Sequence, residues 1–225
     1  MTTGLLLRAF QHVDSQFPSG GFAFSQGLEA ASQLQDLLGP FDPETSVTVQ
    51  INNRWAGADR VALVRAYRCG GDLSTLAEVD AEVEASTCND LLRAGSRRNG
   101  IGLLTSHARI GRPEASRYRE MIRSSLAFGH LTVVQGLIWR SLGIDESTAI
   151  LMSGYQAATS LTTAAIRLGL VGAIEAQVVL ERSLDRVAAL ADDPVATGQP
   201  LQSFIPLSEI AVAMHGTSGQ RLFSN

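Results

Sequence analysis

The sequence predicts an all-α protein, a single helical-bundle domain of about ten helices followed by a flexible C-terminal tail. Apolar residues recur at i, i+3 and i+4 along most of the chain, and the breaks between these runs fall at glycine and proline. Only residues 47–51 alternate as a strand would, and no second strand is available to pair with them. In a helix, Val47, Ile51 and Trp55 share one face, so we expect a helix there as well.

Helices in the first half of the chain are expected to begin and end at recognisable residues. Asp42 before Pro43 is typical of a helix start, because aspartate caps free N–H groups and proline suits the first turn. Asp72 is a second such cap, and Gly-Pro or Gly-Gly pairs end the preceding helices. The expected helices cover residues 4–13, 22–38, 43–55, 60–69 and 73–94.

The second half continues the helical pattern up to a linker. We expect the polar stretch of residues 95–100 to interrupt the preceding helix. Asp145 is a further N-cap, and the expected helices cover residues 113–126, 131–142, 146–168 and 171–190. Residues 192–202 contain two prolines and a glycine, as linkers do. The predicted organisation is therefore an all-α domain over residues 1–202 and a partner-docking tail over residues 203–225.

Charge and composition exclude several kinds of chemistry. All 18 basic residues are arginine, so the chain has no lysine for a P-loop, for a Schiff base or for a kinase-type site. The formal net charge of −4 argues against a nucleic-acid-binding protein, which needs a basic face. No apolar stretch is long and uncharged enough to span a membrane. Two cysteines without a CxxC spacing favour a reducing, cytoplasmic setting.

One serine and the four histidines are the candidates for catalytic or metal-binding groups. Ser25 lies in Ala-Phe-Ser-Gln-Gly, which is similar to a nucleophile elbow, but an elbow needs a strand before the serine and a turn precedes it here. The histidines, His12, His107, His130 and His215, show no chelating spacing and are more typical of packed or surface side chains. We therefore predict no catalytic residue and no metal site.

A basic stretch allows two interpretations. It comprises Arg93, Arg97, Arg98 and Arg109. The arginines could form a solvated face, paired with Glu82, Glu84 and Asp90. They could equally form a docking patch for a partner that carries carboxylates or phosphates, because the guanidinium group binds both.

Residues 14–29, DSQFPSGGFAFSQGLE, resemble the N-terminal signature of the urease accessory protein UreF family. Further blocks resemble that family in the expected order: Arg93 with Ser96 and Gly100, Phe128-Gly129-His130 with Gly136, the Ala-Ile-Arg-Leu-Gly run around Arg167, Met214-His215, and Arg221-Leu222-Phe223-Ser224. The resemblance covers nearly the whole chain. The sequence departs from the family pattern at Phe24, where histidine or tyrosine is common, and at Gly216, where glutamate is usual.

The resemblance implies an all-α, dimeric protein that is not an enzyme. UreF proteins bridge the scaffold UreD, called UreH in some systems, and the GTPase UreG, and with apo-urease they assemble the complex that inserts nickel. No cofactor is expected to bind tightly: nickel would be in transit, and GTP would bind to UreG. The alternative function is an all-α interaction module, or a hydrolase, unrelated to urease.

The resemblance also implies the residues that contact partners. A loop and helix at a partner surface would contain Gly20, Gly21, Phe22, Ser25, Gly27 and Glu29. Arg93 and Arg167, with Ser96 in the same middle block as Arg93, would order internal polar contacts or line a passage for nickel. For Arg167, a buried and satisfied arginine of a helical bundle is an equal alternative. The tail would dock on UreD through His215, Arg221, Leu222 and Phe223. Arg97 or Arg98 could act as an arginine finger toward UreG.

Overall fold

The computed structural model describes residues 2–18, 27–33 and 41–215, and these residues form helices and no strand, which confirms the all-α prediction. The helices are α1 (Thr3–Val13), α2 (Leu28–Gln33), α4 (Pro43–Gln50), η2 (Ile51–Asp59), α5 (Arg60–Arg68), α6 (Leu73–Ser86), α7 (Asp90–Arg109), α8 (Pro113–Arg123), α9 (Leu131–Ser141), α10 (Glu146–Arg167), α11 (Ala173–Ala191) and α12 (Pro206–His215). Of these described helices, none is long and apolar enough to cross a membrane.

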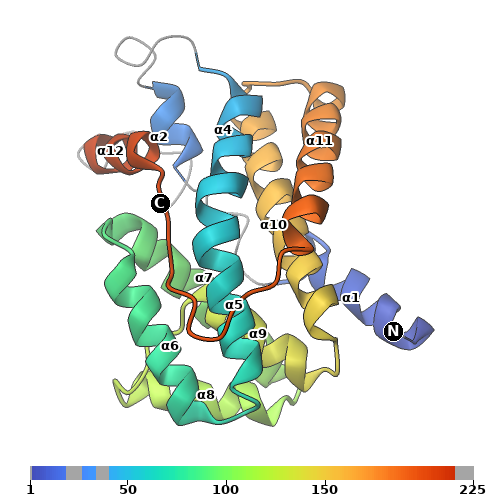
Figure 1. Ribbon diagram of the computed structural model, residues 1–225, viewed down its shortest axis with the longest axis vertical. Helices are drawn as coiled ribbons and strands as arrows, with labels where there is room; N and C mark the ends of the chain where they lie inside the picture. The colour runs from blue at the N-terminus through green and yellow to red at the C-terminus, as the bar shows by residue number, and fades with distance from the viewer. Residues whose placement is uncertain (1, 19–26, 34–40, 216–225) are drawn as a thin grey trace.

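A long rod made of α4, the π-helical segment η2 and α5 runs through the middle of the molecule (Figure 1). The Asp42 carboxylate accepts from the N–H groups of Glu44 and Thr45, so the predicted cap is present. Val47, Ile51 and Trp55 are all buried, which confirms that they share a face. The indole Nε1 of Trp55 donates to Ser153 Oγ at 3.0 Å and ties the rod to α10.

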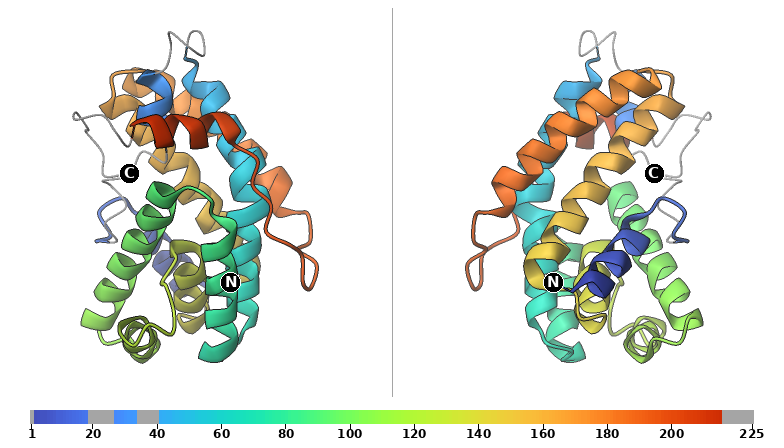
Figure 2. Two further views of the ribbon diagram at one scale, coloured as in Figure 1. Left: turned by 90° about the vertical axis from the view of Figure 1, so that its left-hand side faces the viewer. Right: turned by 90° about the vertical axis from the view of Figure 1, so that its right-hand side faces the viewer.

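Two groups of helices pack around this rod. The antiparallel pair α10 and α11 lies along its upper part, and α6, α7, α8 and α9 surround its lower part (Figures 1 and 2). The largest buried side chains, including Trp55, Trp139 and Tyr118, belong to one core. At Gly136 on α9, a β-carbon would lie 2.6 Å from the Leu63 carbonyl oxygen, so glycine allows α9 and α5 to approach closely.

The expected break at residues 95–100 is wrong. Helix α7 runs through this stretch, and the chain breaks at residues 87–89 instead, where the Asn89 side chain caps α7 by accepting from the N–H groups of Leu91 and Leu92. Gly100 is buried, and a β-carbon there would overlap the carbonyl of Gly129. The glycine is therefore present to let the start of α9 approach α7, not to end a helix.

Part of the expected tail packs on the rest of the chain. The backbone N–H groups of Gln202 and Phe204 donate to the carbonyls of Gly57 and Asn53, both at 2.9 Å, so this stretch lies along η2. Helix α12 then lies beside α2 (Figure 1). The boundary between domain and tail at residue 203 stays a prediction.

Candidate partner-binding surface

The start of α2 and helix α12 form one unit, although they are far apart in the sequence. Gly27 has a φ of 88°, and a β-carbon there would lie 2.9 Å from Val212 Cγ2 on α12. Four buried side chains, Ala30, Leu92, Ala211 and Val212, form a small cluster of their own, separate from the main core. The predicted signature segment and the predicted tail are therefore in contact within a single chain.

Hydrogen bonds add to this packing. Gln50 Nε2 donates to Ser208 Oγ at 3.1 Å, and Asn89 Nδ2 donates to the carbonyl of Glu209 at 3.2 Å. Glu29 is only 2% exposed, and its carbonyl accepts from Ser32 Oγ. Glu29 therefore belongs to the inside of the unit, and a role for it in partner binding stays a prediction.

The outer side of α12 is apolar and exposed. Leu207, Ile210 and Met214 follow each other at i, i+3 and i+7, and Phe204 just before the helix is 75% exposed. A contiguous apolar face of this kind on a small helix is typical of a protein interaction site. We call these four residues the α12 apolar stripe.

The predicted site residues fall partly outside the part of the chain that the structure describes. Seven lie outside the described residues: Gly20, Gly21, Phe22, Ser25, Arg221, Leu222 and Phe223. His215 is the last residue of α12. The segment just before Ser25, where a nucleophile elbow would need a strand, also lies outside the described residues, so the hydrolase alternative stays a prediction.

Two further predicted residues, Arg93 and Ser96, lie in an internal polar cluster centred on Glu84 of α6. Arg93 pairs with Glu84 at 3.3 Å and with Asp90. His130 Nε2 lies 2.8 Å from Glu84 Oε2, and its Nδ1 lies 3.1 Å from Ser96 Oγ. Arg93 and Ser96 therefore make internal contacts, and a role for either residue in partner binding stays a prediction.

His130 is neutral near pH 7 in this cluster. It is fully buried, and desolvation lowers its pKa to about 4, with the charges of Arg97 and Arg93 adding to the effect and that of Asp80 opposing it. In the neutral ring, Nε2–H donates to Glu84 and Nδ1 accepts from the Ser96 hydroxyl. The order of groups is similar to that of a nucleophile, base and carboxylate. Ser96 Oγ also accepts from the Leu131 N–H at 3.3 Å, so the same groups tie the start of α9 to α7.

The arginine-finger interpretation finds no support at Arg97. Its guanidinium group donates to both oxygens of Glu84, one of them at 2.7 Å, and lies 5.1 Å from the ring centroid of Phe128. A finger must reach into a partner, and these contacts hold Arg97 on its own chain. The first interpretation of the basic stretch, pairing with acidic residues of α6 and α7, therefore describes Arg93 and Arg97.

Sequence reasoning missed Asp80, a fully buried residue of α6. Its carboxylate accepts hydrogen bonds from the consecutive N–H groups of Phe128, Gly129 and His130 at 2.6–3.0 Å, and from the Tyr118 hydroxyl at 2.8 Å. Burial and the neighbouring Asp80 raise the pKa of Tyr118, which therefore stays a donor. A signal was available, because Asp80 lies one residue after Val79 and three before Val83, on the apolar side of α6.

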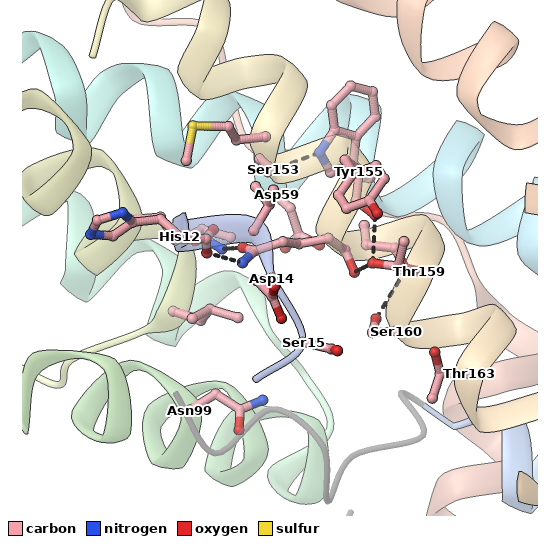
Figure 3. Close-up of a pocket in the computed structure, with 18 of the residues that line it drawn as sticks. His12, Asp14, Ser15, Asp59, Asn99, Ser153, Tyr155, Thr159, Ser160 and Thr163 are labelled. Atoms are coloured by element: carbon pink, nitrogen blue, oxygen red, sulfur yellow. Dashed lines mark hydrogen bonds between the residues drawn. The ribbon is translucent and has the colours of Figure 1, made fainter. Parts of the chain in front are cut away.

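A cavity of about 940 Å³ opens between α1, α7 and α10 (Figure 3). The side chains of Tyr155, Thr159, Ser160 and Thr163 line it from α10, opposite Asp14, Ser15 and Asn99. Arg167 also lines it and is exposed, so it is not the buried arginine that a helical bundle could equally contain. A role for Arg167 in lining a nickel passage stays a prediction.

Three rings stack beside this cavity. His12 lies 4.9 Å from Phe17 and 5.1 Å from His107 between ring centroids. His12 Nδ1 donates to the carbonyl of Arg8 at 2.7 Å, and burial lowers the pKa of His107 to about 4. The expectation of packed histidines is confirmed for His12, His107 and His130. Among the described residues, no group of three or more potential ligands could hold a metal ion.

Comparisons of the sequence with known proteins show which family it resembles. The family model described as UreF matches residues 44–184. The chain is 31% identical to urease accessory protein UreF 1 of Brucella melitensis, over 98% of this chain and 92% of that protein. It is 29% identical to urease accessory protein UreF of Trichodesmium erythraeum, over 97% and 96%, and 25% identical to that of Yersinia enterocolitica over both full lengths. The chain belongs to the UreF family of urease accessory proteins.

Proposed function

We propose that the chain is a non-catalytic scaffold in urease maturation. It bridges UreD, or UreH, and the GTPase UreG, and it regulates the GTP-dependent delivery of nickel to apo-urease. It acts in the cytoplasm as a homodimer. Nickel passes through the complex as cargo, and GTP stays on UreG.

The observation that carries this proposal is the unit formed by α2 and α12. The segment with the family signature packs against the helix that precedes the C-terminal block, and the packed unit leaves the α12 apolar stripe exposed. A scaffold needs such an accessible apolar face, whereas an enzyme needs convergent titratable groups in a pocket. Both cysteines, Cys69 and Cys88, are free thiols, which fits a reducing compartment.

The experiment is co-purification of the chain with co-expressed UreD and UreG, followed by activation of apo-urease with nickel and GTP. Truncation after residue 215 removes the block with Arg221, Leu222 and Phe223 and leaves α12 in place. A second variant, Leu207→Ser/Ile210→Ser, makes the α12 apolar stripe polar. We expect both variants to lose binding to UreD and to fail to activate urease. Size-exclusion chromatography of the unchanged chain tests whether it is a dimer.

The matched control is Ile174→Ser/Val178→Ser, which changes two exposed apolar residues of α11. We expect this variant to retain its partners and its activation of urease. Loss of partners in the control to the same extent would show that any exposed apolar pair matters, and the role of the α12 apolar stripe would be rejected. Failure of the unchanged chain to bind UreD or UreG would reject the scaffold function.

A further inference from the structure

The turn before α8 and α8 itself carry a basic surface in an acidic protein. Residues 109–123 contain five arginines and two glutamates, a net charge of +3, whereas the whole chain carries −4 and the remaining residues therefore carry −7. The arginines are Arg109, Arg112, Arg117, Arg119 and Arg123. We call these five residues the α8 arginine surface.

The helix geometry leaves three of these arginines exposed and two, Arg112 and Arg119, half-buried. Ala115 and Tyr118 are fully buried and attach α8 to the core. Arg109, Arg117 and Arg123 are exposed. Arg112, Arg119 and Arg123 are separated by seven and four residues, a spacing that puts them along one strip of the helix. Arg117, two residues before Arg119, lies on the other side of the helix, so the positive charges border the exposed half of α8 on both sides.

Among the described residues, little compensates this charge. Within the described part of the chain, the one ion pair of these five arginines joins Arg123 to Glu120 at 3.3 Å, and both side chains are more than 60% exposed, so solvent screens the pair strongly. Arg93 and Arg97, in contrast, are held by Glu84. Like charges on neighbouring helical positions repel each other, so a surface kept in this state is suited to a partner of opposite charge.

Apolar residues flank the arginines on both sides. Ile110 before α8 is 58% exposed, and Leu126 after it is 65% exposed. Arginine beside exposed aliphatic side chains is typical of protein interfaces, in which arginine is enriched and an apolar centre is surrounded by polar groups.

We propose that residues 109–126 form a docking surface for an acidic face of a partner protein. The surface lies at the end of the molecule opposite α2 and α12 (Figures 1 and 2). A partner on the α8 arginine surface would therefore leave the α12 apolar stripe accessible to another, which is the arrangement that a bridge requires. The inference relies on the proposed function only for the choice of partners to test.

The test compares two charge-reversed variants that carry the same total charge. Arg117→Glu/Arg119→Glu reverses the α8 arginine surface. Arg182→Glu/Arg186→Glu reverses two arginines of α11, which pair with Glu44 and donate to Asn52 in the unchanged chain. The affinity of each full-length protein for UreD, UreG and apo-urease is measured at about 50 mM and about 300 mM salt, because screening weakens attraction between exposed charges.

We expect the unchanged chain to bind one of these partners about tenfold more weakly at high salt. The α8 variant should bind that partner at least tenfold more weakly at low salt and show little salt dependence, and the α11 variant should stay within twofold of the unchanged chain. Circular dichroism and thermal melting check that both variants are folded. A folded α8 variant that binds within twofold of the unchanged chain overturns the proposal while the scaffold function stands.

If the unchanged chain binds none of these partners, the scaffold function fails and poly-L-glutamate replaces the partner as an acidic probe. Binding to this polymer that the α8 variant loses and the α11 variant keeps supports the acidic-partner surface by itself. Equal binding by all three proteins overturns it. Binding of duplex DNA that depends on the α8 arginine surface, without binding of poly-L-glutamate, would also overturn it.

Discussion

Gly27 and Val212 are in contact, although 185 positions separate them in the sequence: a β-carbon on residue 27 would lie 2.9 Å from Val212 Cγ2. The φ of 88° at Gly27 adds a conformation that other residues adopt only with strain. Gly27→Ala should therefore lower the free energy of unfolding by about 2 kcal/mol, from backbone strain and overpacking together. Urea denaturation measures the loss, and limited proteolysis within residues 206–215 reports whether α12 has loosened.

A second substitution separates the two causes. Val212→Ala in the Gly27→Ala background removes the atom that the new methyl group would meet, so it should restore part of the protection of α12 but not the cost of the backbone strain. If Gly27→Ala were as stable as the unchanged chain and equally resistant to protease, the contact between these residues would not exist.

Local signals predicted most of the helices correctly. Asp72 and Asp145 cap α6 and α10 as expected, because capping involves only the next three residues. The expected break at Gly100 is wrong, because the small size of this glycine serves the approach of Gly129 from a distant part of the chain. The contact between residues 27–33 and α12 likewise depends on tertiary packing, so local sequence patterns could not predict it.

The polar cluster could be predicted only in part. The resemblance pointed to Arg93 and Ser96, but not to the carboxylates that organise their surroundings. Glu84 and Asp80 look like solvated charges of α6 until residues 128–130 fold over them. Charged residues at apolar positions of a helix are the one sequence signal that could have found Asp80.

Asp80→Asn should be strongly destabilising. The carboxylate accepts four hydrogen bonds in a fully buried site, and an amide would turn two hydrogen atoms toward groups that are themselves donors. We expect a loss of about 3 kcal/mol in the free energy of unfolding, typical of disrupting a buried charged network. Thermal or urea denaturation of the full-length chain measures it.

Tyr118→Phe is the matched control for Asp80→Asn. It removes one of the four donors and leaves the three backbone N–H groups on the carboxylate, so the loss should be about 1 kcal/mol. Equal losses in the two variants would mean that Asp80 acts only through Tyr118, and the role of the carboxylate in positioning residues 128–130 would be rejected.

Stability should rise with pH between about 4 and 6.5 because of His107. Burial and the nearby charges of His12 and Arg112 lower its pKa to about 4 in the folded chain, while in the unfolded chain it stays near 6.5. In this window the unfolded chain binds more protons, so acidification favours unfolding by up to about 3 kcal/mol at pH 4, and the effect disappears above pH 6.5.

His107→Phe should flatten this pH dependence while preserving the ring stack with His12 and Phe17. Urea denaturation from pH 4 to pH 8 should show a smaller slope for the variant between pH 4 and 6.5, with a residual slope from His130, whose pKa is also lowered to about 4. Identical slopes in the variant and the unchanged chain would contradict the assignment of this effect to His107.

Gly136→Ala should disrupt the packing between α9 and α5. The added methyl group would lie 2.6 Å from the Leu63 carbonyl and 2.8 Å from the Ala66 side chain, and a backbone carbonyl cannot move aside as a flexible side chain could. We expect a loss of about 3 kcal/mol in the free energy of unfolding.

Gly4→Ala is the matched control, because nothing lies within 4 Å of its added β-carbon and alanine favours the helix. This variant should gain up to about 1 kcal/mol in the free energy of unfolding. In urea denaturation, a destabilised Gly136→Ala variant beside a stabilised Gly4→Ala variant would support the close approach at Gly136. A stabilised Gly136→Ala variant would show that α9 and α5 lie farther apart than these distances.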